Sequence, residues 1–253
     1  MMKTQVLVLF FLIYLSTISA RGQCGEPITL ATQAQVDAFP ATHPCTEVTG
    51  DFSISGSDIT NLDSLYRLSK IDGVLTISSN NHLANLDGLS ALTSLGISLN
   101  GFMSLVITGN PELISIKGLK SLASIPGTLQ IENNVALPNL DGLESLAQIG
   151  SLQMRIVSLF INGNTSLKNI NALSALHSVG GYYLGLIDIE NNAALTDVNG
   201  FSSLQTITGG FNAGLTLINN GALTNVDGLS SFTKFTASQG IIRIIDNVRR
   251  TPN

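Results

Sequence analysis

The chain has 253 residues, of which 44% are hydrophobic, 11% are charged and 6% are aromatic. Charged residues make up about a quarter of an ordinary soluble domain, so charge is scarce here. The net charge of −5 argues against nucleic acid as a partner, because that binding draws on Lys and Arg. Frequent Leu and Ile exclude disorder, and no apolar run beyond residue 20 approaches the roughly 18 residues of a membrane-spanning helix. The composition indicates a folded chain that turns often and buries aliphatic side chains.

The first 22 residues have the layout of a secretory signal peptide. Lys3 provides a positive start, residues 6–15 form an unbroken apolar run too short to span a bilayer, and small residues follow. We predict a signal peptide over residues 1–22, cleaved after Gly22 or Ala20. The mature protein is then secreted or held at the cell surface, with no transmembrane segment. Because cleavage removes Lys3 and Arg21 but no acid, the mature chain is more negative still.

Cys24 and Cys45 are the only cysteines, and an exported protein meets an oxidising compartment. We predict that they form a disulfide, whose loop is worth about 3 kcal/mol in the chain-entropy model. Two cysteines and three His do not suit a four-ligand structural metal site, so we expect no metal and no cofactor. Residues 33–39 are predicted to form a short helix that ends at Pro40. Residues 23–50 are therefore predicted to form a disulfide-stapled N-terminal cap.

A repeat of 24 to 30 residues runs through the rest of the chain. Its clearest unit has Ile77, then Asn three residues later and Leu six residues later, followed by apolar residues at every third position. Self-similarity at this period is typical of a solenoid. A spacing of three suits short extended pieces joined by bends, and the alternation in residues 75–77 marks the main strand of a coil. We predict an all-β solenoid of about eight coils over residues 51–247, in which stacked coils share one apolar core.

Seven asparagines occupy the same position of the repeat. An amide at a tight bend can bond the backbone of its own and adjacent coils, whereas a chemical role would set one Asn apart from the others. We therefore predict a structural ladder along the rod. The single glycosylation sequon, Asn164-Thr165-Ser166, uses a ladder position, so we expect it to be buried and unmodified. The predicted ladder residues are Asn80, Asn110, Asn134, Asn164, Asn192, Asn220 and Asn247.

The repeat pattern L-x-I-x-x-N-x-x-L-x-x-L-x-G-L-x-x-L-x-x-I resembles the receptor L domain, the leucine-rich β-helical module of insulin- and epidermal-growth-factor-type receptors. It is more similar to secreted bacterial surface proteins that carry this module, and residues 32–39 and 45–54 look like their N-terminal segment. The resemblance covers about residues 24–247 and implies a right-handed β-helix with binding at its surface. It does not imply receptor signalling, because no cysteine-rich segment or transmembrane helix follows. A leucine-rich repeat horseshoe is the alternative fold, although such repeats place one residue, not two, between the Asn and the next Leu.

Length variation falls almost entirely in one gap, between the last apolar residue of a coil and the next main strand. Four coils have 10 or 12 residues there, and the short coils have 6. Insertions at one register map to one face, often the binding face, and aromatic and Arg side chains are frequent interface anchors. We predict a ridge of loops that binds a protein or peptide at the cell surface. The alternative is that the extra residues lengthen the sheet and pack back on the rod. The candidate binding residues are Phe102, Met103, Arg155, Tyr182, Tyr183, Phe211 and Asn212.

Catalysis is not predicted. The acids are spread among turn positions, and no nucleophile triad, HExxH, phosphate-loop or calcium-repeat motif occurs. Glu132 and Glu190 lie two coils apart, about 10 Å by coil spacing, which is too far for the paired carboxylates of an inverting glycosidase. In the recurrent Asp-Gly turn register, Lys117 stands between Asp87 and Asp141, which relieves stacking of like charges. A purely structural envelope or adhesion protein is the alternative to a recognition module.

Residues 248–253 leave the repeat pattern and are predicted to form an irregular tail. A terminal repeat normally carries a polar cap, and none is evident here. We expect either that the natural protein continues beyond Asn253 or that a partner covers the apolar end of the last coil.

Overall fold

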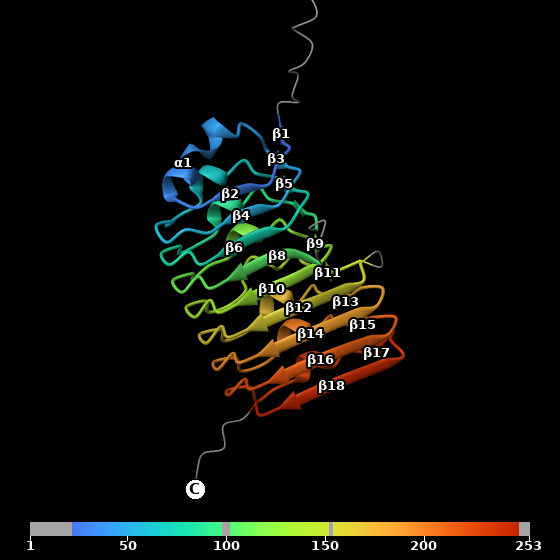
Figure 1. Cartoon of the computed structure of the whole chain (residues 1–253). Helices are drawn as coiled ribbons and strands as arrows, with labels where there is room; N and C mark the ends of the chain where they lie inside the picture. The colour runs from blue at the N-terminus through green and yellow to red at the C-terminus, as the bar shows by residue number, and fades with distance from the viewer. Residues whose placement is uncertain (1–21, 98–101, 152–153, 248–253) are drawn as a thin grey trace, which may run out of the picture.

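The structure, a computed structural model, describes residues 22–97, 102–151 and 154–247. Its coils stack into a rod walled by parallel strands, with the N-terminal cap at one end (Figure 1). The predicted all-β solenoid is therefore confirmed. Residues 1–21 and 248–253, where the predicted signal peptide and tail lie, fall outside the described part of the chain.

The main wall is a parallel sheet of nine strands, in which each strand pairs with the strands of the coils before and after it. The eight strands from β4 to β18 match the eight predicted coils, and the cap adds β2 as a ninth. The strands are β2 Ile28–Leu30, β4 Phe52–Ile54, β6 Leu75–Ser78, β8 Met103–Thr108, β10 Thr128–Glu132, β12 Ile156–Asn162, β14 Leu184–Glu190, β16 Asn212–Ile218 and β18 Gln239–Ile245.

A second wall consists of short parallel strands on the other side of the coils (Figure 1). A leucine-rich repeat horseshoe carries one strand per repeat, so this second wall supports the β-helix over that alternative. Four strands form its first part, namely β1 Gln23–Cys24, β3 Glu47–Val48, β5 Lys70–Ile71 and β7 Ser94–Leu95. Five strands form its second part, namely β9 Ser124–Ile125, β11 Gln148–Ile149, β13 Ser178–Gly180, β15 Thr206–Thr208 and β17 Lys234–Phe235.

Single turns of 3-10 helix form a third column between the two walls. They begin at the residues of the Asp-Gly turn register. The turns are η1 Asp63–Leu65, η2 Asp87–Leu89, η3 Lys117–Leu119, η4 Asn171–Leu173, η5 Asn199–Phe201 and η6 Asp227–Leu229.

The core lies inside the stacked coils. Leu83, Leu86, Leu89 and Leu92, which follow the three-residue period, are all fully buried. One inward side chain per bend explains this period. Gly88 shows how closely the coils approach, because a Cβ atom at this position would collide with the carbonyl of the preceding coil. Burial of aliphatic side chains between neighbouring coils therefore holds the rod together.

The cap contains the helix α1 Gln33–Thr42, and the prediction that Pro40 ends this helix was wrong. Pro40 lies in the last helical turn, where its missing N–H removes a single backbone hydrogen bond. The turn closes beyond it, because the His43 N–H donates to the Phe39 carbonyl at 2.8 Å. The ring of Phe39 packs edge-on against that of Phe52, with 5.6 Å between ring centroids. The helix thereby covers the open end of the first coil.

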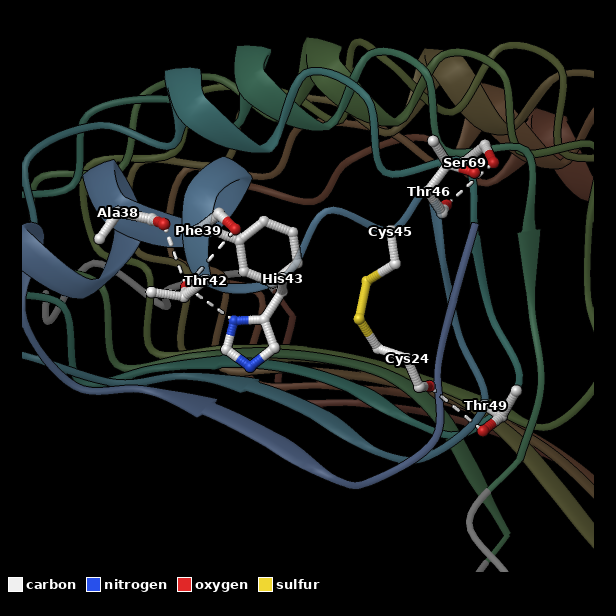
Figure 2. Close-up of a disulfide and its surroundings, with 9 residues drawn as sticks. All are labelled: Cys24, Ala38, Phe39, Thr42, His43, Cys45, Thr46, Thr49 and Ser69. Atoms are coloured by element: carbon white, nitrogen blue, oxygen red, sulfur yellow. Dashed lines mark hydrogen bonds between the residues drawn. A yellow bond between two sulfur atoms is a disulfide. The ribbon is translucent and has the colours of Figure 1, made fainter. Parts of the chain in front are cut away.

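The predicted disulfide between Cys24 and Cys45 is confirmed and joins β1 to the segment that follows α1 (Figure 2). Hydrogen bonds on either side tie the same region to the first coil. The Thr49 hydroxyl donates to the Cys24 carbonyl at 3.2 Å, and the Ser69 hydroxyl donates to the Thr46 carbonyl at 3.0 Å. Since β1 pairs with β3 and β2 with β4, the cap is itself built as a coil.

At the other end of the rod, β18 has no described strand beyond it. Ile242 and Ile244 pair with Leu215 and Leu217, which are almost completely buried. Ile242 and Ile244 themselves are 50% and 48% exposed, so the last described coil presents apolar side chains at its surface. In the described residues, no helix combines the length and apolar character required to cross a membrane.

Candidate functional site

The seven ladder asparagines are buried and bond to one another from coil to coil. Asn110 is typical, because its N–H and its Nδ2 both donate to Oδ1 of Asn134, at 3.1 and 3.0 Å. Its Nδ2 also donates to the Ile77 carbonyl at 3.1 Å. The same bonds recur from Asn80 to Asn247. Every amide is thus used within the rod, and none is left to meet a ligand.

Asn164 of the glycosylation sequon has no exposed surface. Its Nδ2, the atom that glycosylation would modify, donates to the Ile131 carbonyl at 2.9 Å and to Asn192 Oδ1 at 3.3 Å. Modification of the folded protein would require this amide to leave the core.

The residue before each ladder asparagine adopts the left-handed backbone conformation. Sequence reasoning missed this feature, although Gly, Asn and Asp predominate at this position and tolerate the conformation best. Ser79 is the residue least suited to it, with φ of 57°. The left-handed residues are Ser79, Gly109, Asn133, Gly163, Asn191, Asn219 and Asp246.

Four aromatic residues of the candidate ridge are exposed to solvent. Tyr182 and Phe211 are 60% and 62% exposed, Tyr183 is 44% exposed and Phe102 is 37% exposed. The guanidinium of Arg155, which is also exposed, lies 5.1 Å from the centroid of the Tyr183 ring. Tyr182 contacts Tyr183 edge-on, with 5.0 Å between centroids. All five side chains therefore lie on the surface of the rod, and Tyr183 contacts both Arg155 and Tyr182.

The candidate binding residues of three of the four longer coils lie next to one another. The Tyr183 N–H donates to the Arg155 carbonyl at 3.0 Å, and the Phe211 N–H donates to the Tyr183 carbonyl at 3.0 Å. Arg155, Tyr183 and Phe211 are therefore stacked on consecutive coils, just before β12, β14 and β16. We call these three residues and Tyr182 the aromatic ridge. Phe102 lies apart, because the short coil that contains Gly127 intervenes and carries no aromatic residue there.

The insertions also lengthen the main sheet, as the alternative interpretation held. β6 has four residues, whereas β12, β14 and β16 have seven each. Met103 and Asn212 are the first residues of β8 and β16 and are half-buried, so placing them in loops was wrong. The added residues extend the hydrogen-bonded ladder, and the aromatic residues occupy the bend that precedes it. Residues 98–101 and 152–153 of these insertions fall outside the described part of the chain.

The outer face of the main sheet carries the acidic residues Glu132, Asp188 and Glu190. Glu132 and Glu190 both pair with Asn162, one on each side, so two coil spacings separate them. Asp188, which sequence reasoning missed, lies on the same face and is identifiable from the alternation of β14. Burial raises the pKa of Asp188 above its ordinary value, and a hydrogen bond with Thr216 partly opposes this. Within the described ranges, no group of three or more His, Cys, Asp or Glu side chains could hold a metal ion.

Residues 44–120 match the family model of the receptor L domain. This segment runs from the residue before Cys45 to the residue after η3, so it spans the junction of the cap with the first coils. The match confirms the resemblance over that part of the chain. No curated protein and no solved structure matches the chain.

Proposed function

We propose that this protein is an extracellular recognition module that binds a protein or peptide partner through the aromatic ridge. Receptor L domains are extracellular and bind protein ligands without catalysis, and residues 44–120 match that family. The observation that carries the proposal is the exposure of Tyr182, Tyr183 and Phe211 side by side on adjacent coils. Aromatic and Arg side chains supply much of the binding energy at protein interfaces.

The rod orders the aromatic ridge before any partner binds. Adjacent coils are about 4.8 Å apart, so Arg155, Tyr183 and Phe211 span about 10 Å along the rod. Their backbones are joined by coil-to-coil hydrogen bonds, and the Arg155 guanidinium lies over the Tyr183 ring. A surface that is ordered before binding loses less conformational entropy when the complex forms. Large exposed aromatic groups in a cluster are also unusual on a protein that has no partner.

The test compares Tyr182→Ala, Tyr183→Ala and Phe211→Ala with the unchanged protein. A partner captured from cell surfaces by the unchanged protein is identified, and its affinity for each variant is then measured. A true anchor should weaken binding by about 2 kcal/mol, while the melting temperature stays nearly constant because the side chains are exposed. Tyr66→Ala is the matched control, since Tyr66 is 57% exposed but lies beside η1 near the cap.

Unchanged capture by all three ridge variants would contradict the proposal. If these variants also lost several kcal/mol of stability, the ridge would be part of the packing, and the protein would be a structural rod. Weakened capture by Tyr66→Ala to the same degree would show that binding depends on general surface aromaticity and not on the ridge.

A further inference from the structure

The column of 3-10 turns is interrupted in one coil, and a hollow lies at the interruption. η3 and η4 are separated by a coil in which residues 141–142 form an ordinary turn, with Gly142 at a positive φ of 116°. The hollow has a volume of about 450 Å³ and is lined by residues of three successive coils. Small-molecule sites have volumes of roughly 300 to 1,000 Å³, so it can hold a compact ligand.

Two lysines line this hollow, Lys117 at the start of η3 and Lys120 directly after η3. Side chains three residues apart in a 3-10 turn lie on the same side, so Lys117 and Lys120 point outward together. Lys117 Nζ lies 3.6 Å from the Asp141 carboxylate of the following coil. Lys120 has no ion pair with any residue that the structure describes. The Lys120 ammonium is therefore available to a ligand, and the Lys117 ammonium is held only weakly by Asp141.

Carboxylates border the two lysines on the coils before and after. Asp87 lines the hollow from η2, and Glu144 lines it from the interrupted coil. The Glu144 carboxylate is held in place, because it accepts a hydrogen bond from the Gly142 N–H at 2.9 Å. The Asp87 and Glu144 carboxylates, which accept hydrogen bonds, therefore lie on the coils on either side of the two lysines. Each coil is about 4.8 Å from the next.

Gly118 and Gly142 line the inner part of the hollow. Close stacking explains both glycines, since a Cβ atom at either position would collide with the Leu86 or Ile116 carbonyl of the preceding coil. A consequence is that backbone, without side chains, faces this part of the hollow. Among the residues that the structure describes, no aromatic side chain lines the hollow, which argues against a ligand held by ring stacking.

We propose that this hollow is a binding site for an acidic sugar, that is, a small polyhydroxylated ring with one carboxylate. The carboxylate of the ligand lies between the ammonium groups of Lys117 and Lys120, where charge-assisted hydrogen bonds are strongest. Hydroxyl groups of the ring donate to the carboxylates of Asp87 and Glu144. A ligand with several negative charges is disfavoured, because the carboxylates of Asp87, Glu144 and the nearby Asp141 would repel the additional charges. The site is on the 3-10 column and shares no residue with the aromatic ridge.

The experiment titrates glucuronate into the full chain at low salt and follows the backbone amide resonances by NMR. We expect saturable shifts of the Gly118 and Gly142 amides with glucuronate and none with glucose, which lacks the carboxylate. Lys120→Ala should weaken binding about tenfold or more, in keeping with the loss of a charged hydrogen bond. Lys168→Ala, which removes an exposed lysine of another coil, should bind like the unchanged protein.

Three results would overturn the proposal. The first is the absence of saturable shifts up to about 50 mM glucuronate, a concentration that would detect even a millimolar affinity. The second is equal binding of glucose and glucuronate. The third is equal weakening by Lys120→Ala and Lys168→Ala, which would indicate unspecific attraction. Because Lys120 is exposed and unpaired among the described residues, Lys120→Ala should fold normally, and its amide spectrum verifies this in the same samples.

Discussion

Asn134, in the middle of the ladder, offers the sharpest test of how the rod is held together. Its Oδ1 accepts from the N–H and Nδ2 of Asn110, and its Nδ2 donates to the Ile107 carbonyl at 2.9 Å and to Asn164 Oδ1 at 3.3 Å. In Asn134→Ala, the Asn110 N–H and the Ile107 carbonyl lose these partners. The site has no exposed surface, so bulk water does not replace the lost bonds directly.

The magnitude follows mainly from the buried Asn110 N–H, which loses its acceptor, because Ile107 stays paired with Ile131 in the β8–β10 ladder. A buried group without a hydrogen bond costs about 1 to 3 kcal/mol, so we expect Asn134→Ala to lower the free energy of unfolding by about that amount. Asn247→Ala should cost less, because this residue bonds to the ladder on one side only within the described chain. The stability of a repeat protein is approximately a sum over its repeats and the interfaces between neighbouring repeats. The cost of a substitution therefore depends on how many neighbouring coils the residue contacts.

The assay is urea unfolding of both variants beside the unchanged protein and Asn81→Ala. Asn81 is exposed and adjoins the ladder residue Asn80, so its loss controls for the chemistry of the substitution. We expect a change below about 0.5 kcal/mol for this control, which is usual for a surface substitution. An equally small change in Asn134→Ala would refute the reasoning, because the ladder would then contribute nothing beyond the apolar core.

Three further predictions address the cap, the bends and the sheet face. The double variant Cys24→Ser with Cys45→Ser should lose about 3 kcal/mol in urea unfolding, and a loss below about 1 kcal/mol would show that the cap holds without its disulfide. Ser79→Asn should gain about 0.5 to 1 kcal/mol, because Asn tolerates the left-handed backbone better; an equal gain in Ser79→Ala would contradict this explanation. Asp188 has a raised pKa in the folded protein, so the folded state binds more protons there and its contribution to stability falls as pH rises from the unfolded pKa through the folded pKa. Asp188→Asn should remove that decline and stabilise the protein at neutral pH, which melting curves between about pH 3 and pH 7 would detect; the same decline in the variant would assign it to another group.

Much of the architecture could be predicted because it repeats along the chain. The inward direction of Leu83, Leu86 and Leu89 follows from a spacing of three residues, and the buried position of Asn164 follows from its register. Export chemistry made the Cys24–Cys45 bond predictable in the same way. Each of these inferences needs only local sequence and a count of positions.

Other features depend on how one coil sits on the next. Pro40 was expected to end α1, but the helix continues to Thr42 because it packs on the first coil through Phe39. The hollow beside Lys120 exists because one turn of the 3-10 column is replaced by a bend at Gly142. Neither outcome is decided by residues close in sequence.

The aromatic ridge separates what the sequence predicts from what the stacking of coils decides. The sequence by itself determined that four coils are longer, that the extra residues share one register, and that they include aromatic side chains. Only the tertiary structure decided that Tyr183 and Phe211 lie side by side and exposed, while Phe102 is set apart and Met103 and Asn212 join strands. The physical reason is that periodicity fixes whether a side chain points into or out of its own coil. Which side chains meet across coils depends on the stacking register and the length of every coil between them.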